Sequence, residues 1–206
     1  MELTGRVAVV PTADGRVRRR ERNREAIIDA LFGLVGRGVL QPTAQEVAAA
    51  AGVGIRSVFR HFSEIESLHR AMDSRLEAEA LRLVTTPRAT GALDDRIRGL
   101  VRQRAALFER VAPYKRSANL QRWRSSFLQG RHLRMQRLLR DELRAWLPEL
   151  ATTPPPLVEA VDLLTSIEAW ERLRVDRRLG AAGAAAVVEG GLWALLGGRS
   201  RGAKRP

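Results

Sequence analysis

The chain has 206 residues and is therefore long enough to bury a sizeable core, as one domain or as two small ones. It contains no cysteine, which excludes disulfides and the zinc ribbons and fingers that depend on thiolate ligands. Its 36 basic and 23 acidic residues give a formal charge of +13, which favours polyanionic partners, with nucleic acid first and an anionic membrane second.

Both ends of the chain are expected to be disordered, over residues 1–16 and 199–206. The only apolar run in the first segment, residues 7–10, is too short for the core of a secretory signal. Between the ends, apolar residues recur at spacings of three and four, and no β-branched run alternates with a period of two. The fold is therefore predicted to be all-α. Helix breaks are expected where turn residues cluster, at 36–38, 52–54, 85–87, Pro113 and 152–156.

Two short helices, 44–51 and 55–61, are predicted on either side of a glycine turn. Thr43 and Glu46 form a T-x-x-E capping box, in which the hydroxyl accepts a backbone N–H three residues on and the carboxylate reaches back. Gly52 ends the first helix because glycine enters the left-handed conformation at little steric cost. Helix, tight turn and helix in this order form a helix-turn-helix unit.

The second of these helices is expected to present polar groups on its outer surface, since Val47, Val58 and Phe62 would face the preceding long helix. The side chains left for the outer surface are Arg56, Ser57, Arg60 and His61. Arginines on a short helix can lie in the major groove and bond guanine edges or phosphates. The basic run at 16–24 would supply an arm that reaches the DNA backbone or the minor groove.

Three segments follow one another here: REAIIDALFGLVGRG at 24–38, PTAQEVAAAAGVGIRSVFRHF at 42–62, and a long helix that begins SEIESLHRAM. Together they resemble the TetR (tetracycline repressor) family of bacterial transcriptional regulators. The resemblance implies a three-helix DNA-binding domain over 17–70 and a larger helical effector-binding and dimerisation domain over 71–198. It also implies a ligand-responsive repressor that binds a palindromic operator in double-stranded DNA as a homodimer. The candidate DNA contacts are Arg18, Arg19, Arg20, Thr43, Arg56, Ser57, Phe59, Arg60 and His61.

Three positions differ from the family pattern. Gly54 stands where a Ser commonly caps the recognition helix, and Phe59 keeps the ring of the usual Tyr without its hydroxyl. Ile65 replaces a Lys that commonly contacts phosphate. Because these changes remove common phosphate contacts, the arginines are expected to carry more of the binding.

Two helices near the C-terminus, 157–179 and 181–196, match by position the helices with which family members pair. In the second, a stripe of small residues would allow close helix approach beside one aromatic anchor. The candidate interface residues are Leu164, Ala182, Ala186, Gly190 and Trp193. An internal core helix is the alternative interpretation. The stretch 180–198 is nearly uncharged but consists mostly of Ala and Gly, so no membrane span is expected and the protein is predicted to be cytoplasmic.

The middle of the chain, residues 96–144, holds 14 basic residues and only three acidic ones. A solvated face is one explanation, since 34 of the 36 basic residues are arginine, a skew that codon bias alone would produce. The other is an anionic effector, such as a fatty acid or acyl conjugate, with arginines at its head group and apolar side chains around its tail. The candidate pocket residues are Leu107, Phe108, Trp123, Phe127 and Trp146.

Other classes of protein fit the sequence less well. The chain has only three histidines, His61, His69 and His132, and the first two lie eight residues apart with no flanking pair of carboxylates at ligand spacing, so we predict no metal site, catalytic site or cofactor. A membrane-surface protein would leave the capping box and the glycine turn without a role. A nonspecific nucleoid protein would share the basic charge and is the alternative function; a footprint on a discrete palindrome would separate the two.

Overall fold

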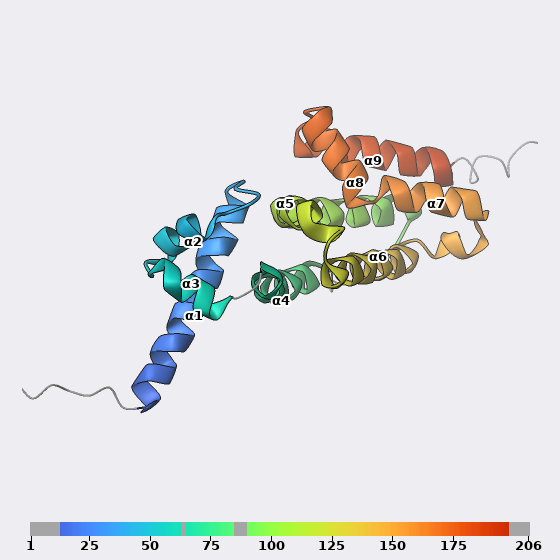
Figure 1. Cartoon of the computed structure of the whole chain (residues 1–206). Coiled ribbons are helices and arrows are strands. Elements are labelled where there is room, and N and C mark those ends of the chain that lie inside the picture. Colours follow the sequence, from blue (N-terminus) through green and yellow to red (C-terminus); the bar gives the residue numbers. More distant parts are fainter. Residues whose placement is uncertain (1–12, 63–64, 85–89, 198–206) are drawn as a thin grey trace, which may run out of the picture. The chain divides into compact units, whose positions relative to one another are not determined.

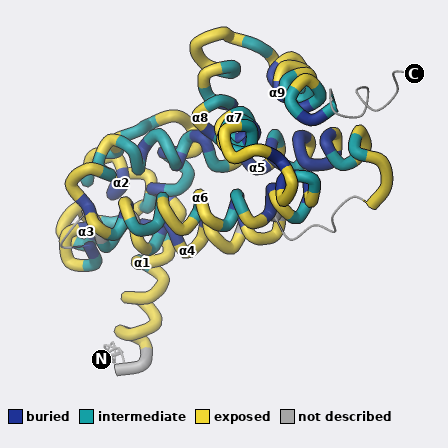
Figure 2. The backbone as a smooth tube through the Cα atoms, turned by 90° about the vertical axis from the view of Figure 1, so that its right-hand side faces the viewer, coloured by how far each residue is buried: buried dark blue, intermediate teal, exposed yellow. Residues whose placement is uncertain are grey.

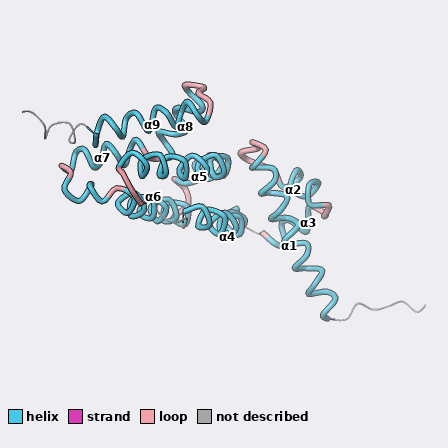
Figure 3. Tube along the Cα trace, turned by 180° about the vertical axis from the view of Figure 1, so that it is seen from behind, coloured by secondary structure: helices cyan, strands magenta, loops and turns pink. Residues whose placement is uncertain are grey.

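The computed structural model describes residues 13–62, 65–84 and 90–197. Within these ranges every regular element is helical and none is a strand, which confirms the predicted all-α fold (Figure 3). The elements are α1 (Ala13–Gly36), α2 (Ala44–Ala51), α3 (Ile55–His61), α4 (Ile65–Val84), α5 (Leu93–Arg122), α6 (Ser126–Trp146), the 3₁₀ helix η1 (Pro148–Thr152), α7 (Pro155–Leu164), α8 (Ile167–Glu171), the π-helical turn η2 (Arg172–Asp176) and α9 (Ala181–Leu196).

The chain divides into two compact units, Met1–Met72 and Asp73–Pro206, and the division falls inside α4, which Figure 1 labels with the other helices. The sequence places this boundary between residues 70 and 71. One continuous helix therefore belongs to both units, and its part in the second unit carries the buried residues Asp73, Leu76 and Ala80.

In the first unit, α1 packs against α2 and α3. Ile27, Ile28, Leu31 and Val35 are buried at helical spacing on the C-terminal half of α1. Residues 15–22, in its N-terminal half, are exposed (Figure 2). Residues 13–16, expected to be disordered, form the start of α1. Residues 1–12 and 199–206 lie outside the described residues.

The second unit is a helical bundle in which α5 contacts α6, α8 and α9, and α7 contacts α8 and α9. Its core is one continuous cluster of buried apolar side chains drawn from α4 to α9. Members that are almost wholly inaccessible include Ile97, Leu100, Leu107, Phe108, Leu143, Leu147, Val161 and Leu192. The core therefore fixes the long helices that surround any ligand site in this unit.

Two predicted features of this unit are wrong. Pro113 does not break a helix but lies inside α5, because its neighbours Ala112 and Tyr114 are buried and this packing outweighs a proline cost of about 3 kcal/mol. The single helix expected over 157–179 is interrupted after Leu164. There the Thr165 hydroxyl donates to the Val161 carbonyl at 2.9 Å, and the Ser166 hydroxyl accepts the Ala169 N–H at 3.2 Å to cap α8.

Candidate functional sites

The turn between α2 and α3 is built from local hydrogen bonds. The Thr43 hydroxyl accepts the Glu46 N–H at 3.2 Å, and the Glu46 carboxylate accepts the Thr43 N–H at 2.7 Å, which confirms the predicted capping box. These bonds to Thr43 lower the pKa of Glu46. Gly52 adopts φ 64°, in the left-handed region, and α2 and α3 have the predicted bounds. Gly54 begins α3 without a side-chain cap.

The outer face of α3 displays Arg56, Phe59 and Arg60, all exposed. Arg60 Nη2 donates to the Ser57 hydroxyl at 3.1 Å, which holds the guanidinium along the helix. Phe59 is 59% exposed, an unusual position for a phenyl ring on a helix that buries Val58 beside it. The face therefore combines two cations with an apolar ring, and these are groups that contact phosphates, base edges and thymine methyls.

His61 does not lie freely on this face. Its Nε2 atom is buried and makes no hydrogen bond with any described residue. Burial first, and then the charges of Arg60, Arg20 and Arg24, lower the pKa of His61 below its usual 6.5. A lowered pKa favours the neutral imidazole, so a phosphate contact by the half-buried His61, which stays a prediction, would carry no positive charge at neutral pH.

The basic segment ahead of the unit is helical rather than an extended arm, since Arg18, Arg19 and Arg20 lie in α1. All three are exposed. On a helix they can approach phosphates, but they do not form the flexible strand that enters a minor groove.

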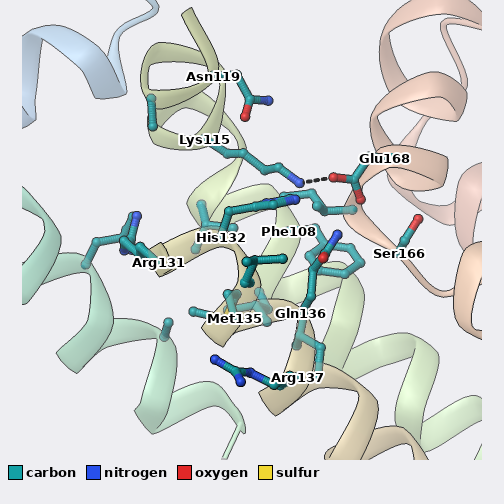
Figure 4. A pocket seen from close by; sticks show the side chains of 18 of the residues that line it. Phe108, Lys115, Asn119, Arg131, His132, Met135, Gln136, Arg137, Ser166 and Glu168 are labelled. Carbon is teal, nitrogen blue, oxygen red and sulfur yellow. Dashed lines mark hydrogen bonds and ion pairs between the residues drawn. The ribbon is translucent and has the colours of Figure 1, made fainter. Parts of the chain in front are cut away.

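The second unit contains a cavity of about 410 Å³ between α4, α5, α6 and the α7–α8 segment (Figure 4). Its apolar lining comes from Leu76, Ala80, Leu107, Phe108, Val111, Leu128, Leu133, Met135, Leu139 and Ile167. Its polar lining comes from Arg104, Lys115, Asn119, Arg122, Arg131, His132, Gln136, Arg137, Arg140, Asp162, Ser166 and Glu168. This volume and mixed lining are typical of a small-molecule site.

One ion pair in the cavity lining joins α5 to α8, where the Lys115 ammonium bonds the Glu168 carboxylate (Figure 4). His132 of α6 lies beside it, and burial, followed by the charges of Arg122 and Lys115, lowers the pKa of His132. A second pair joins Arg131 of α6 to Asp73 of α4. The cavity wall is thus tied to α4, the helix shared by both units.

A third pair is buried and includes the lining residue Arg104. Arg104 contacts Glu142 at 3.0 Å and donates to the Thr165 carbonyl at 3.2 Å, where α7 ends. Arg104 also bonds the Leu139 carbonyl of α6. Because one guanidinium joins three segments, it holds the break between α7 and α8 against α5 and α6.

Only part of the predicted pocket lines this cavity. Leu107 and Phe108 do, whereas Trp146 lies in the closed core and Phe127 is half-buried outside the lining. Trp123 is 78% exposed at the end of α5, with the Arg122 guanidinium 4.7 Å from its ring centroid. Three polar lining residues, Lys115, His132 and Glu168, were not among the predicted pocket residues, and the sequence contains a signal for the first of them.

The spacing of residues on α5 is the sequence signal that places Lys115 in the lining. Phe108, Val111, Lys115 and Arg122 follow one another at intervals of three, four and seven, so they share the helix face on which Phe108 lies. Extending the face of the predicted Phe108 along the helix would have reached Lys115. Glu168 carries no such signal, because it lies on α8 and its place at the cavity depends on the break at Thr165.

The candidate dimer residues separate into two groups. Leu164 and Trp193 pack against the core of their own chain, and the Arg98 guanidinium lies 5.5 Å from the Trp193 ring centroid. Leu164 packs on α9 at Gly191, where an added Cβ would lie 2.5 Å from Leu164 Cδ2. Exposed positions form a stripe along α9 that consists of Ala182, Ala186, Val187 and Gly190.

The opposite face of α9 is internal, with Ala184, Val188, Leu192 and Leu196 buried. The helix α9 therefore has an inner face that belongs to the core and an outer, exposed face of mostly small residues. Across residues 13–62, 65–84 and 90–197, no group of three or more His, Asp or Glu side chains is arranged to hold a metal ion. No helix in those ranges has the length and apolar character that crossing a membrane requires.

Comparison with known proteins gives a match at the level of structure. No protein-family model matches the chain and no curated protein matches it. A tetR-family transcriptional regulator from Streptomyces coelicolor is similar, with a TM-score of 0.66 and 22% identity over 88% of this chain and 83% of that one. A putative TetR-family regulator from Rhodococcus sp. has a TM-score of 0.58 and 16% identity over 84% of this chain and 98% of that one. The chain has the fold of these regulators.

Proposed function

We propose that this protein is a sequence-specific DNA-binding transcriptional regulator. The observation that carries the proposal is the α2–turn–α3 unit, in which Arg56 and Arg60 are exposed on one face of a seven-residue helix whose other face is anchored by Val58 and Phe62. A helix of this length fits the major groove and places its outward side chains at base edges. The fold shared with TetR-family regulators supports the same conclusion.

A homodimer on a palindromic operator is part of the proposal, because one short helix contacts too few base pairs to select a site in a genome. The exposed small-residue stripe of α9 (Ala182, Ala186, Val187, Gly190) is the surface we assign to pairing. Small side chains let two helices approach closely, and a twofold axis would place the same stripe on both subunits.

Ligand-controlled repression completes the proposal. Leu76 and Ala80 of α4 line the cavity, and Asp73 pairs with Arg131 in its wall. A ligand that prefers one arrangement of this wall would bias α4, and thereby lower operator affinity by its differential affinity for the two arrangements. A cytoplasmic location belongs to the same proposal.

Selection of bound duplexes from a random pool tests the function. We expect a palindromic consensus, and we expect Arg56→Ala and Arg60→Ala each to weaken binding to that consensus about tenfold or more, because each loses about 1–3 kcal/mol of groove contacts. Arg102→Ala is the matched control, since it removes an exposed arginine from α5 in the other unit.

Two outcomes would contradict the proposal. Recovery of DNA without any consensus would favour the nonspecific nucleoid alternative. Equal losses for Arg102→Ala and for the two α3 variants would mean that overall charge, and not the outer face of α3, determines binding.

A further inference from the structure

We propose that the cavity of the second unit binds an amphipathic anion, a single acidic head group on an apolar chain, whose head group pairs with Lys115 in place of Glu168. This inference deepens the effector part of the proposed function, because it names the ligand class of the same cavity. The lining of this cavity has an apolar part and a charged part.

The apolar part of the lining is preformed. Leu107 and Phe108 are each only 2% exposed and are held by the core, and Leu139 and Ile167 are likewise buried around the same space. Such a surface gains free energy when it contacts hydrocarbon, at roughly 25 cal/mol per Å² removed from water. A volume of about 410 Å³ accommodates a chain of medium length.

The charged part of the lining is unbalanced toward the positive sign. Six basic side chains (Arg104, Lys115, Arg122, Arg131, Arg137, Arg140) stand against two acidic ones (Asp162, Glu168). Three of the six bind carboxylates outside the lining, with Arg104 on Glu142, Arg131 on Asp73 and Arg140 on Glu159. Arg122 has no carboxylate partner among the described residues and lies on the Trp123 ring instead.

The cavity stays net positive even when these three carboxylate partners are included. Three basic side chains of the lining then remain against its two acidic ones. An anion lowers this imbalance, whereas a cationic ligand increases it. Burial is the main cause of the lowered pKa of His132, and the charges of Arg122 and Lys115 add to it in the direction that a positive cavity requires.

The Lys115–Glu168 pair is the part of the lining that can exchange partners. The Lys115 side chain is only 16% exposed, so it needs an anionic partner inside the cavity. The Glu168 side chain is 50% exposed, so it can turn to water at little cost. A ligand carboxylate can therefore take the place of Glu168 without leaving a buried charge unpaired (Figure 4).

Calorimetric titration with decanoate, decanol and decylamine, below their micelle concentrations, tests the proposal on the DNA-free protein. The three probes share one apolar chain and differ only in head-group charge. We expect decanoate to bind about tenfold or more tightly than decanol, and decylamine to bind most weakly, since a charge-assisted hydrogen bond contributes about 1.5–3 kcal/mol.

Substitutions of Lys115 and Glu168 should change the affinity for decanoate in opposite directions. Lys115→Gln should weaken decanoate binding about tenfold and leave decanol unchanged, whereas Glu168→Gln should tighten decanoate binding because Lys115 then has no competing carboxylate. Arg102→Gln, an exposed charge change on the same helix outside the lining, is the control. Circular dichroism melts check that each variant folds.

The proposal is overturned if decanoate fails to bind, if the three probes bind equally, or if Glu168→Gln weakens decanoate binding in a folded protein. This last variant keeps the proposal testable even where Lys115→Gln fails to fold. The DNA selection described above is independent of these titrations, so failure of the regulator proposal and failure of the ligand class are distinguishable.

Discussion

Asp73 of α4 shows how one buried acid links stability to pH. Burial raises its pKa from 3.8 to about 6, although Arg131 and Arg134 act in the opposite direction, and Glu77 adds to the rise. Because the folded chain holds this proton more tightly than the unfolded chain, the contribution to stability is full below about pH 4 and is lost as pH rises through about 6.

Replacing this acid should therefore flatten the pH dependence. Between about pH 4 and about pH 7 we expect the free energy of unfolding of the wild type to fall by about 1–3 kcal/mol relative to that of Asp73→Asn. Denaturant unfolding at several pH values measures this difference. Asp141→Asn, which removes a 74% exposed carboxylate from α6, is the control and should keep the wild-type profile. Parallel curves for wild type and Asp73→Asn would contradict the assignment.

At the scale of elements, the helix-turn-helix depends on backbone conformation at two glycines with different roles. Gly52 has φ 64° and closes α2, whereas Gly54 has φ −70° and ψ 146°, an extended conformation open to any residue. An added Cβ meets nothing within 4 Å at either position, so the backbone angle alone distinguishes them.

Paired substitutions should separate these roles. Gly52→Ala should lower the free energy of unfolding by about 1 kcal/mol, since a Cβ disfavours the left-handed region. Gly54→Ser should raise it by a few tenths of a kcal/mol, about 0.5 at most, because the hydroxyl supplies the missing cap of α3. Thermal unfolding followed by circular dichroism measures both. A loss of similar size for the two variants would show that steric space, not backbone conformation, governs the turn.

At the scale of the whole molecule, the proposed dimer would pair two chains through the exposed stripe of α9. Ala186 lies in the exposed stripe, and Ala106 on α5 is also exposed. We expect the wild type to sediment as a dimer at micromolar concentration and Ala186→Glu to weaken the dimer about tenfold or more, because a charge enters a close helix contact. Ala106→Glu should sediment as the wild type does. A monomeric wild type would exclude the dimer.

The sequence by itself determined the elements whose signals are local. Thr43 with Glu46, and Gly52 with Gly54, fix the ends of α2 and α3 through hydrogen bonds and backbone angles within a few residues. The bounds of α9 were predictable for the same reason, since Gly180 precedes the helix and Gly197 follows it. The outward placement of Arg56 and Arg60 follows from helical spacing alone.

Only the tertiary structure decided features that depend on distant packing. The helix α5 continues through Pro113, and α7 ends at Leu164. Trp123 is exposed to solvent, whereas Trp146 is buried in the core. The tertiary structure also brought Lys115 and Glu168, 53 residues apart, into contact in the lining of one cavity. No local sequence pattern predicts such long-range contacts, because the free energy that favours them comes from side chains of several helices packed together.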